Sequence, residues 1–487
     1  MTTLARTSQV TVICNDSLIP PINRLPEGLS MTVIPRLILS AVAICVSCIA
    51  FADNEKKFLY TLTNNIKENE NAVAQYKRLN DGTIQFIRFY KTNGTGINNN
   101  THGKLGPQDN DSQIIVTNDK KRLYAVNTHS NNISGFNIKK DGTLTEIPGS
   151  PFPSKGIAPV SINISGNILV AANRNEDYHQ KASLADPEGA SYTSFEIQQN
   201  GSLMYADNLK VPGFQKPAQI HASKTVKNLF FADEFQVDVD FDGDGSRSFL
   251  AGPKNSVQGQ VRTMRVDERG KITLTDVVTL PETIENYLYI GSPGVPSMPL
   301  GLWSHPSQNI LYAGFVTRNQ LGVFSYDHFG RLKFVNAVNN SGQDICWVLV
   351  NKQATRLYTV NNLPRLNTQQ TTSTISVYDI AGENALSPME IQVVDVPIPG
   401  EAFINNRSLV QPGSTSFEIA LSPDEDFLYV INQRINQTEE NTGKTGNAIH
   451  SFSVQKNGLI KAAASVDLSK DGFPSHSRAQ GVVAVDL

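Results

Sequence analysis

The chain has 487 residues, of which 39% are hydrophobic and 18% charged, and its 34 glycines and 25 prolines are typical of a turn-rich globular protein. The formal net charge is only −3 and no basic run occurs, which argues against nucleic acid as a partner and against binding to an anionic membrane surface. Helical periodicity is absent, so the sequence predicts an all-β protein.

The first element in chain order is an apolar segment within residues 31–52, MTVIPRLILSAVAICVSCIAFA. Arg36 precedes the apolar stretch 37–51, and Ala50 and Ala52 stand just before Asp53, which predicts a signal peptide cleaved after residue 52. An uncleaved anchor is the alternative, but the stretch is shorter than the roughly 20 residues that span a bilayer. Residues 1–30 are interpreted as a non-native upstream extension. Residues 53–487 are therefore expected in the periplasm or outside the cell, free of the membrane and monomeric.

A short turn of the form polar-Gly-x-Leu/Ile recurs along the rest of the chain. Its copies centre on Gly82, Gly142, Gly201, Gly270, Gly330 and Gly458, with a degenerate copy at residues 383–386. Six residues before each glycine, or before Asn384, stands a large apolar residue: Tyr76, Phe136, Phe195, Met264, Phe324, Tyr378 and Phe452. The near-alternating pattern around these residues predicts a strand that runs into a hairpin turn.

A second strand precedes each of these hairpins and carries a hydrophobic pair. The pairs are Leu59-Tyr60, Leu123-Tyr124, Leu169-Val170, Leu229-Phe230, Leu311-Tyr312, Leu357-Tyr358 and Leu428-Tyr429. With one strand before and one after, each unit is a four-stranded meander, and successive turns are 54 to 74 residues apart. Seven such units predict a seven-bladed β-propeller of four-stranded antiparallel blades, with an open β-solenoid as the alternative.

The two ends of the mature chain predict how the ring closes. KKFLYTL (56–62) reads as the second strand of a blade, and SRAQGVVAVDL (477–487) reads as a first strand without a successor. The C-terminal strand is therefore expected to complete the N-terminal blade and to remove the open sheet edges. The long insertions all fall between second and third strands, so they are expected on one face of the ring.

The stretch LYAVNTHSNNISGFNIKKDGTLTEIPGSPFPSKGIAPVSINISGNILVAAN (123–173) resembles a blade of the lactonase propeller family, which includes 6-phosphogluconolactonases and carboxymuconate cyclase. The resemblance extends over residues 56–487 and implies hydrolysis of a sugar-acid lactone without an organic cofactor. It also implies a Pro-His-x-His segment, a Glu after one second strand and an Arg after another. Here residues 217–221 read PAQIH, 313–317 read AGFVT and 360–362 read VNN, so each of these positions departs from the family pattern.

Other residues of the loop-bearing face could still support such chemistry, because lactone opening needs a base and positive groups that hold an anion. Arg174, Arg318 and Arg434 each follow a second strand and, with His129, are the candidate catalytic or anion-binding residues. The same face offers His179, Asp233, Glu234 and Arg365. The alternative is that these are solvated loop charges or ion pairs between blades. His221 is expected to be a core histidine.

The segment Asp238-Val-Asp240-Phe-Asp242-Gly243-Asp244 places carboxylates at alternate positions before a glycine, like the first half of a calcium loop. We therefore expect a calcium ion bound by Asp238, Asp240, Asp242 and Asp244, with a merely polar turn as the alternative.

Two functions remain open at this point. One is an exported lactone hydrolase acting on a small-molecule lactone or carbohydrate-like ligand. The other is a non-catalytic secreted binding propeller for a glycan, peptide or protein partner.

Overall fold

The computed structural model describes residues 56–96, 112–174, 190–211, 215–236, 259–280, 297–363, 373–397, 403–404, 410–411, 413–434, 446–474 and 477–487. The predicted signal peptide and the segment before it lie outside these residues. Residues 56–487 form one compact unit of the chain. No helix among the described residues is long and apolar enough to cross a membrane.

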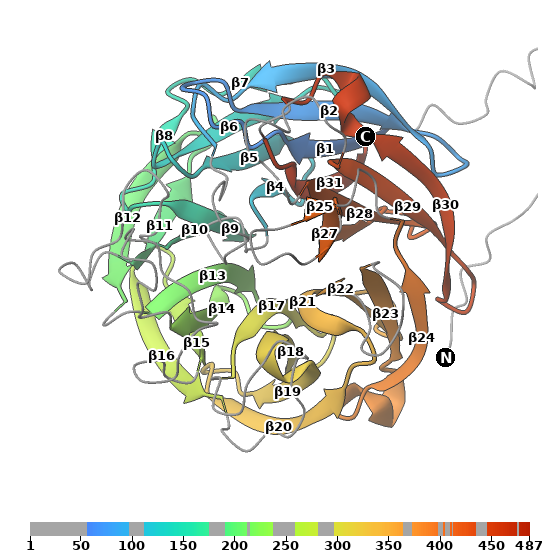
Figure 1. Ribbon diagram of the computed structural model, residues 1–487. Helices are drawn as coiled ribbons and strands as arrows, with labels where there is room; N and C mark the ends of the chain where they lie inside the picture. Colours follow the sequence, from blue (N-terminus) through green and yellow to red (C-terminus); the bar gives the residue numbers. More distant parts are fainter. Residues whose placement is uncertain are drawn as a thin grey trace, which may run out of the picture. The chain divides into compact units, whose positions relative to one another are not determined.

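Seven antiparallel sheets are arranged in a ring, which confirms the predicted seven-bladed propeller (Figure 1). The innermost strands are β31 (Gln480–Asp486), β4 (Ile114–Val116), β9 (Pro159–Ser165), β13 (Gln215–Ala222), β17 (Pro299–Ser304), β21 (Gln343–Val350) and β27 (Ser414–Leu421). The second strands are β1 (Lys57–Leu62), β5 (Arg122–Asn127), β10 (Ile168–Asn173), β14 (Leu229–Gln236), β18 (Ile310–Phe315), β22 (Arg356–Leu363) and β28 (Phe427–Arg434).

The third strands are β2 (Ala72–Arg78), β6 (Asn132–Ile138), β11 (Ser191–Ile197), β15 (Gln260–Val266), β19 (Gln320–Tyr326), β23 (Thr374–Asp379) and β29 (Ala448–Val454). The outer strands are β3 (Ile84–Lys91), the pair β7 (Leu144–Glu146) and β8 (Phe152–Pro153), β12 (Leu203–Lys210), β16 (Ile272–Thr279), β20 (Leu332–Asn339), β24 (Met389–Asp395) and β30 (Ile460–Asp467). A small hairpin, β25 (Phe403–Ile404) and β26 (Val410–Gln411), and the 3₁₀ turns η3 (Val316–Arg318), η4 (Gly382–Ala385) and η6 (Leu468–Asp471) complete the described elements.

The ring closes through the two ends of the described chain, as predicted. Strand β31 pairs with β1 in an antiparallel register that runs from Lys57 opposite Asp486 to Leu62 opposite Gln480. The buried side chains of Arg78 and Asp486 form an ion pair within this first blade. The first blade is therefore completed by a strand from the other end of the described chain.

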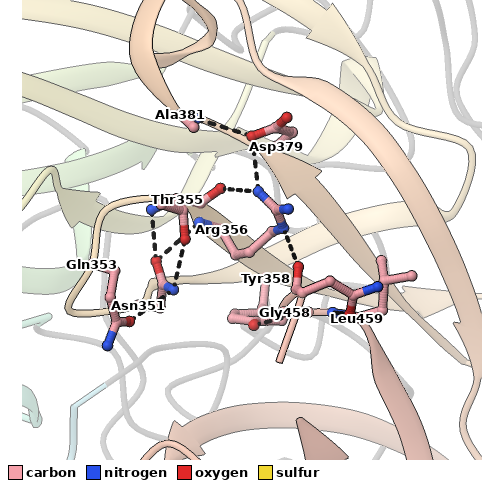
Figure 2. Close-up of polar contacts among 10 residues, drawn as sticks. Asn351, Gln353, Thr355, Arg356, Tyr358, Asp379, Ala381, Gly458 and Leu459 are labelled. Carbon is pink, nitrogen blue, oxygen red and sulfur yellow. Dashed lines mark hydrogen bonds and ion pairs between the residues drawn. The ribbon is translucent and has the colours of Figure 1, made fainter. Parts of the chain in front are cut away.

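The recurrent glycine turns are the places where each blade contacts the one before it. Tyr358, near the start of β22, donates its hydroxyl to the carbonyl of Gly458 in the next blade (2.9 Å), and Arg356 Nε donates to the neighbouring carbonyl of Asn457 (2.9 Å; Figure 2). The same tyrosine-to-glycine bond joins Tyr60 to Gly142 and Tyr124 to Gly201, each at 2.7 Å. The tyrosine of the predicted hydrophobic pair therefore links neighbouring blades.

Glycine is required at these turns for two reasons. Gly458 has φ +80°, a left-handed conformation that residues with a side chain rarely adopt, and a Cβ there would lie 2.4 Å from Arg356 Cγ. The other five glycines of the repeat also have positive φ, between +81° and +92°. At each of the six glycines, an added Cβ would lie within 2.6 Å of an atom of the preceding blade.

Apolar side chains fill the spaces between the blades. The large residue that stands six positions before each turn is buried in all seven blades, with exposures between 0% and 3%: Tyr76, Phe136, Phe195, Met264, Phe324, Tyr378 and Phe452. Cys346 is also buried. The core is therefore distributed around the ring rather than collected at one centre.

We predict that Gly458→Ala destabilises the protein more than Gly382→Ala. Both glycines have positive φ, but a Cβ at Gly382 meets nothing within 4 Å, whereas one at Gly458 would collide with Arg356. The excess should be about 1–3 kcal/mol, the usual cost of overpacking, and urea denaturation would measure it. Equal destabilisation by the two substitutions would contradict the proposed interblade role of the turn.

Candidate functional site

The loop face is defined here as the face at which the second strands end and the innermost strands begin. Several second strands end there in a buried asparagine that serves the fold. Asn361 Nδ2 donates to Thr374 and Ser376 of the third strand (3.0 and 2.9 Å), and its Oδ1 accepts from Asn340 (2.8 Å). Asn127 and Asn173 make corresponding bonds in their own blades. These amides hold the second and third strands together, so their role is structural. The positions at the loop face where another residue replaces the asparagine are therefore the candidates for function.

The fourth blade departs from this pattern because its second strand carries two acids, Asp233 and Glu234, near its end. Asp233 occupies the position that asparagine holds elsewhere, and its carboxylate accepts the backbone N–H groups of Gln219 (2.6 Å) and Gly301 (2.8 Å). Gln219 lies on β13 and Gly301 on β17 of the next blade. Asp233 therefore fixes two neighbouring innermost strands relative to each other at the loop face.

Glu234, the next residue, is completely buried within a network from three strands. It accepts a hydrogen bond from the hydroxyl of Tyr192 on β11 and pairs with Arg262 Nε on β15 at 2.6 Å. Burial raises the pKa of the Glu234 carboxyl, and the Arg262 guanidinium opposes part of that rise. Burial also raises the pKa of Tyr192, which therefore stays protonated and donates. A carboxyl with a raised pKa is a stronger base than an exposed one.

Arg318 lies on the adjoining fifth blade, in the turn η3 that follows β18. Its side chain is buried, and Nε donates to the hydroxyl of Ser297 at 3.0 Å. Ser297 in turn accepts the N–H of Gly259 through its carbonyl (2.7 Å), and a Cβ on Gly259 would lie 3.0 Å from the carbonyl oxygen of Glu234. Gly259, just before β15, therefore lies next to both the backbone of Glu234 and Ser297, the residue whose hydroxyl contacts Arg318. The side chain of Glu234 itself faces Tyr192 of blade three and Arg262.

The other sequence-predicted arginines also lie at the loop face. Arg174 directly follows β10 and its backbone N–H donates to Ala158 (2.9 Å), whereas Arg434 ends β28 and its N–H donates to Asn447 Oδ1 (3.0 Å). Both side chains are buried, and burial lowers the pKa of Arg434. His129 follows β5 and is half-buried. The three arginines thus come from blades three, five and seven.

Several predicted positions lie outside the described residues, namely His179, Arg365, Asp238, Asp240, Asp242 and Asp244. Among the residues that the structure does describe, no group of three or more His, Cys, Asp or Glu side chains is placed to hold a metal ion. His221 is buried on β13, as expected for a core histidine, and lies at the opposite end of its strand from the loop face.

Sequence reasoning placed Glu234 on this face but missed Tyr192, Arg262 and Ser297. Tyr192 and Arg262 lie 42 and 28 residues from Glu234, and only the register of neighbouring strands brings them together. The two strands read SYTSFEI and QVRTMRV and contain several other polar residues, so no pattern within either strand distinguishes Tyr192 or Arg262 before the pairing is known.

The architecture defines the chain as a seven-bladed β-propeller, and comparison with known proteins refines that description. Residues 48–189 match the family described as "Lactonase, 7-bladed beta-propeller". No curated protein matches the chain with significance in sequence. The predicted resemblance to lactonase-type propellers is therefore confirmed by a match of residues 48–189 and by the seven-bladed fold.

Solved structures share the fold at low sequence identity. A candidate 6-phosphogluconolactonase from Bacteroides fragilis is similar with a TM-score of 0.55 and 16% identity, over 90% of this chain and 99% of that one. The periplasmic gluconolactonase of Pseudomonas aeruginosa has a TM-score of 0.55 and 14% identity, over 88% and 99%. A hypothetical selenium-binding protein from Sulfolobus tokodaii reaches 0.54 with 10% identity, over 90% and 95%. At such identities the likeness shows the fold, and function has to be argued from the site.

We predict that Arg262→Met destabilises the protein in a pH-dependent way. Without Arg262 the buried Glu234 carboxylate is unpaired, so its folded-state pKa rises further above the unfolded value. The cost, about 3 kcal/mol, should be fully present at pH values above the raised pKa and should shrink as the pH falls toward 4.5, the ordinary value, because the folded state then holds the proton.

Urea denaturation between pH 5 and 8 would measure this cost. The double variant Arg262→Met/Glu234→Gln should recover most of the stability at pH 8. Failure of the double variant to recover, together with a pH-independent loss in the single variant, would contradict ionisation of Glu234 in the network.

The calcium prediction for Asp238, Asp240, Asp242 and Asp244 can be tested directly. Millimolar calcium should raise the melting temperature and release heat on titration, because carboxylates at alternate positions before a glycine favour this ion. A variant with all four aspartates changed to asparagine is the control and should lose the effect. No heat and no melting shift in the unmodified protein would refute the prediction.

Proposed function

We propose that the protein hydrolyses a lactone, of the sugar-acid type, at the loop face between blades four and five. The observation that carries the proposal is that Glu234, a buried carboxyl with a raised pKa, and the buried Arg318 lie at the same face on adjoining blades, each next to the contact between Gly259 and Ser297. Lactone opening needs this pair of functions, a base for water and a cation for the developing oxyanion.

The chemistry assigns one step to each group. Glu234 accepts a proton from a water molecule as its oxygen bonds to the lactone carbonyl carbon. The guanidinium of Arg318 stabilises the negative charge that forms on the carbonyl oxygen. The ring C–O bond then breaks, and the leaving oxygen takes the proton from the protonated Glu234 to become the hydroxyl of the open-chain acid, which returns Glu234 to its carboxylate form. Tyr192 and Arg262 hold the carboxylate of Glu234 in place through its two oxygens.

Arg174 and Arg434 extend the positive charge around the loop face. Buried guanidinium groups bind carboxylates and phosphates in a fixed, often bidentate geometry. These two residues are proposed to bind the anionic group that a sugar-acid lactone carries or acquires on opening. No organic cofactor is required for such a reaction.

Export to the periplasm or the cell exterior is part of the proposal. It rests on the signal-peptide pattern of residues 31–52 and on the fold that the chain shares with the periplasmic gluconolactonase of Pseudomonas aeruginosa. In such a compartment an unphosphorylated sugar lactone is the more plausible substrate.

A non-catalytic binding propeller is the second candidate function, and one observation favours it. Both oxygens of Glu234 already have partners, Tyr192 and Arg262, as they would in a purely structural ion pair. In that case the arginines of the loop face would bind an acidic glycan, peptide or protein without reaction.

Acid release from a panel of lactones at constant pH separates these functions. We expect turnover of at least one sugar lactone, with about a hundredfold loss of kcat/KM in Glu234→Gln and about tenfold in Arg318→Gln. Activity should fall as the pH drops through the raised pKa of Glu234, because the protonated carboxyl cannot accept a proton from water.

Arg331→Gln is the matched control, because this arginine is exposed on the opposite face and its described contacts are local, with Asp327 and Phe329 of the same turn. It should keep full activity. If no lactone of the panel is turned over, or if Glu234→Gln retains wild-type kcat/KM with an unchanged melting temperature, the hydrolase proposal is overturned.

A further inference from the structure

A second cluster of chemically distinctive side chains lies at the turn face, defined as the face where the second strands begin and the glycine turns lie. It is formed where the innermost strands β13 and β17 of blades four and five end. The residues are His221 and Lys224 from blade four and Trp303 and Ser304 from blade five. None of them belongs to the loop-face site.

His221 presents a hydrogen-bond donor whose direction is fixed by the backbone. The ring is buried, and its Nε2 accepts the backbone N–H of Ser304 at 3.0 Å. In a neutral imidazole the other nitrogen, Nδ1, then carries the proton. Burial holds the pKa of His221 well below its usual value, so the ring is neutral. Within the described part of the chain, Nδ1 has no hydrogen-bond partner.

Lys224 and Trp303 place a cation and an aromatic surface next to this donor. Lys224 Nζ lies 5.1 Å from the centre of the Trp303 ring, and the His221 ring centre lies 5.0 Å from the same ring. Lys224 is exposed to solvent, yet desolvation by the surrounding protein lowers its pKa. No described carboxylate forms an ion pair with it.

The backbone that carries Lys224 is firmly held. Its own N–H donates to Ser304 Oγ at 3.0 Å, and the flanking hydroxyls of Ser223 and Thr225 both contact the hydroxyl of Tyr326 on blade five (3.0 and 2.8 Å). Thr225 also bonds Asn309 at 2.7 Å. The cation is thus presented by a turn fixed to the neighbouring blade, which reduces the entropy that a ligand would lose on binding.

We propose that this cluster is a binding site for a small carboxylate with a flat, apolar body. The carboxylate binds the Lys224 ammonium and the Nδ1–H of His221, and the flat body packs on the exposed part of the Trp303 ring. A cation and a neutral donor match the two oxygens of a carboxylate, and the indole favours a flat apolar partner. The site lies on the opposite face from the proposed hydrolase centre and does not depend on it.

Tryptophan fluorescence gives a direct test, because the chain has only two tryptophans and Trp347 is completely buried. Iodide quenching should therefore report on Trp303. We expect benzoate to protect Trp303 from iodide, and its affinity to fall about tenfold or more in Lys224→Gln, the loss expected for one charge-assisted hydrogen bond. Lys227→Gln is the matched control, since this exposed lysine lies in the same turn and pairs weakly with Glu268 at 4.0 Å.

Four further measurements complete the test. His221→Phe should also weaken benzoate binding, and gluconate, which lacks a flat apolar body, should bind less tightly than benzoate. Absence of protection by benzoate, or equal protection in Lys224→Gln and the unmodified protein, would overturn the site. Protection by chloride as strong as that by benzoate would show a non-specific anion effect and would overturn it as well. Lactone turnover in Lys224→Gln should be unchanged.

Discussion

The contact between each glycine turn and the preceding blade is the constraint on which the rest of the structure depends. The turn must lie against the neighbouring sheet closely enough for the tyrosine hydroxyl to reach the glycine carbonyl, as Tyr358 reaches Gly458. Positive φ and the absence of a Cβ at Gly458 allow this approach. The glycine therefore recurs in the sequence because the neighbouring blade packs against it, and not only because the turn needs it.

The same closure fixes the polar groups at the two faces. With the blades held at the turn face, asparagines such as Asn361 can bind third strands at the loop face and complete each blade internally. Where blade four replaces this amide by Asp233 and adds Glu234, the carboxylates reach across to β17 and to β11 and β15. A buried charge network costs desolvation energy that an asparagine would avoid. Its presence at the loop face, on the blade next to that of Arg318, is the reason for assigning chemistry to it.

The sequence was informative where the physics is local or repeated. The turn at Gly458, the buried Phe452 six residues earlier and the closing strand at 477–487 all follow from patterns within a few residues, and the structure confirms them. The partners of Glu234 could not be predicted in this way, because Tyr192 and Arg262 reach it only through strand register. Likewise the tautomer of His221 depends on the backbone of Ser304, 83 residues away. Contacts between strands that are far apart in the sequence form the site, whereas the repeated local pattern determines the fold.

The most direct test of the account is a structure of the protein with gluconate bound. The account predicts that the gluconate carboxylate lies within hydrogen-bond distance of the Arg318 guanidinium at the loop face, with its hydroxyl chain directed toward Glu234. Gluconate bound at another part of the ring, with the Glu234 and Arg318 side chains untouched, would contradict the central claim that lactone chemistry belongs between blades four and five.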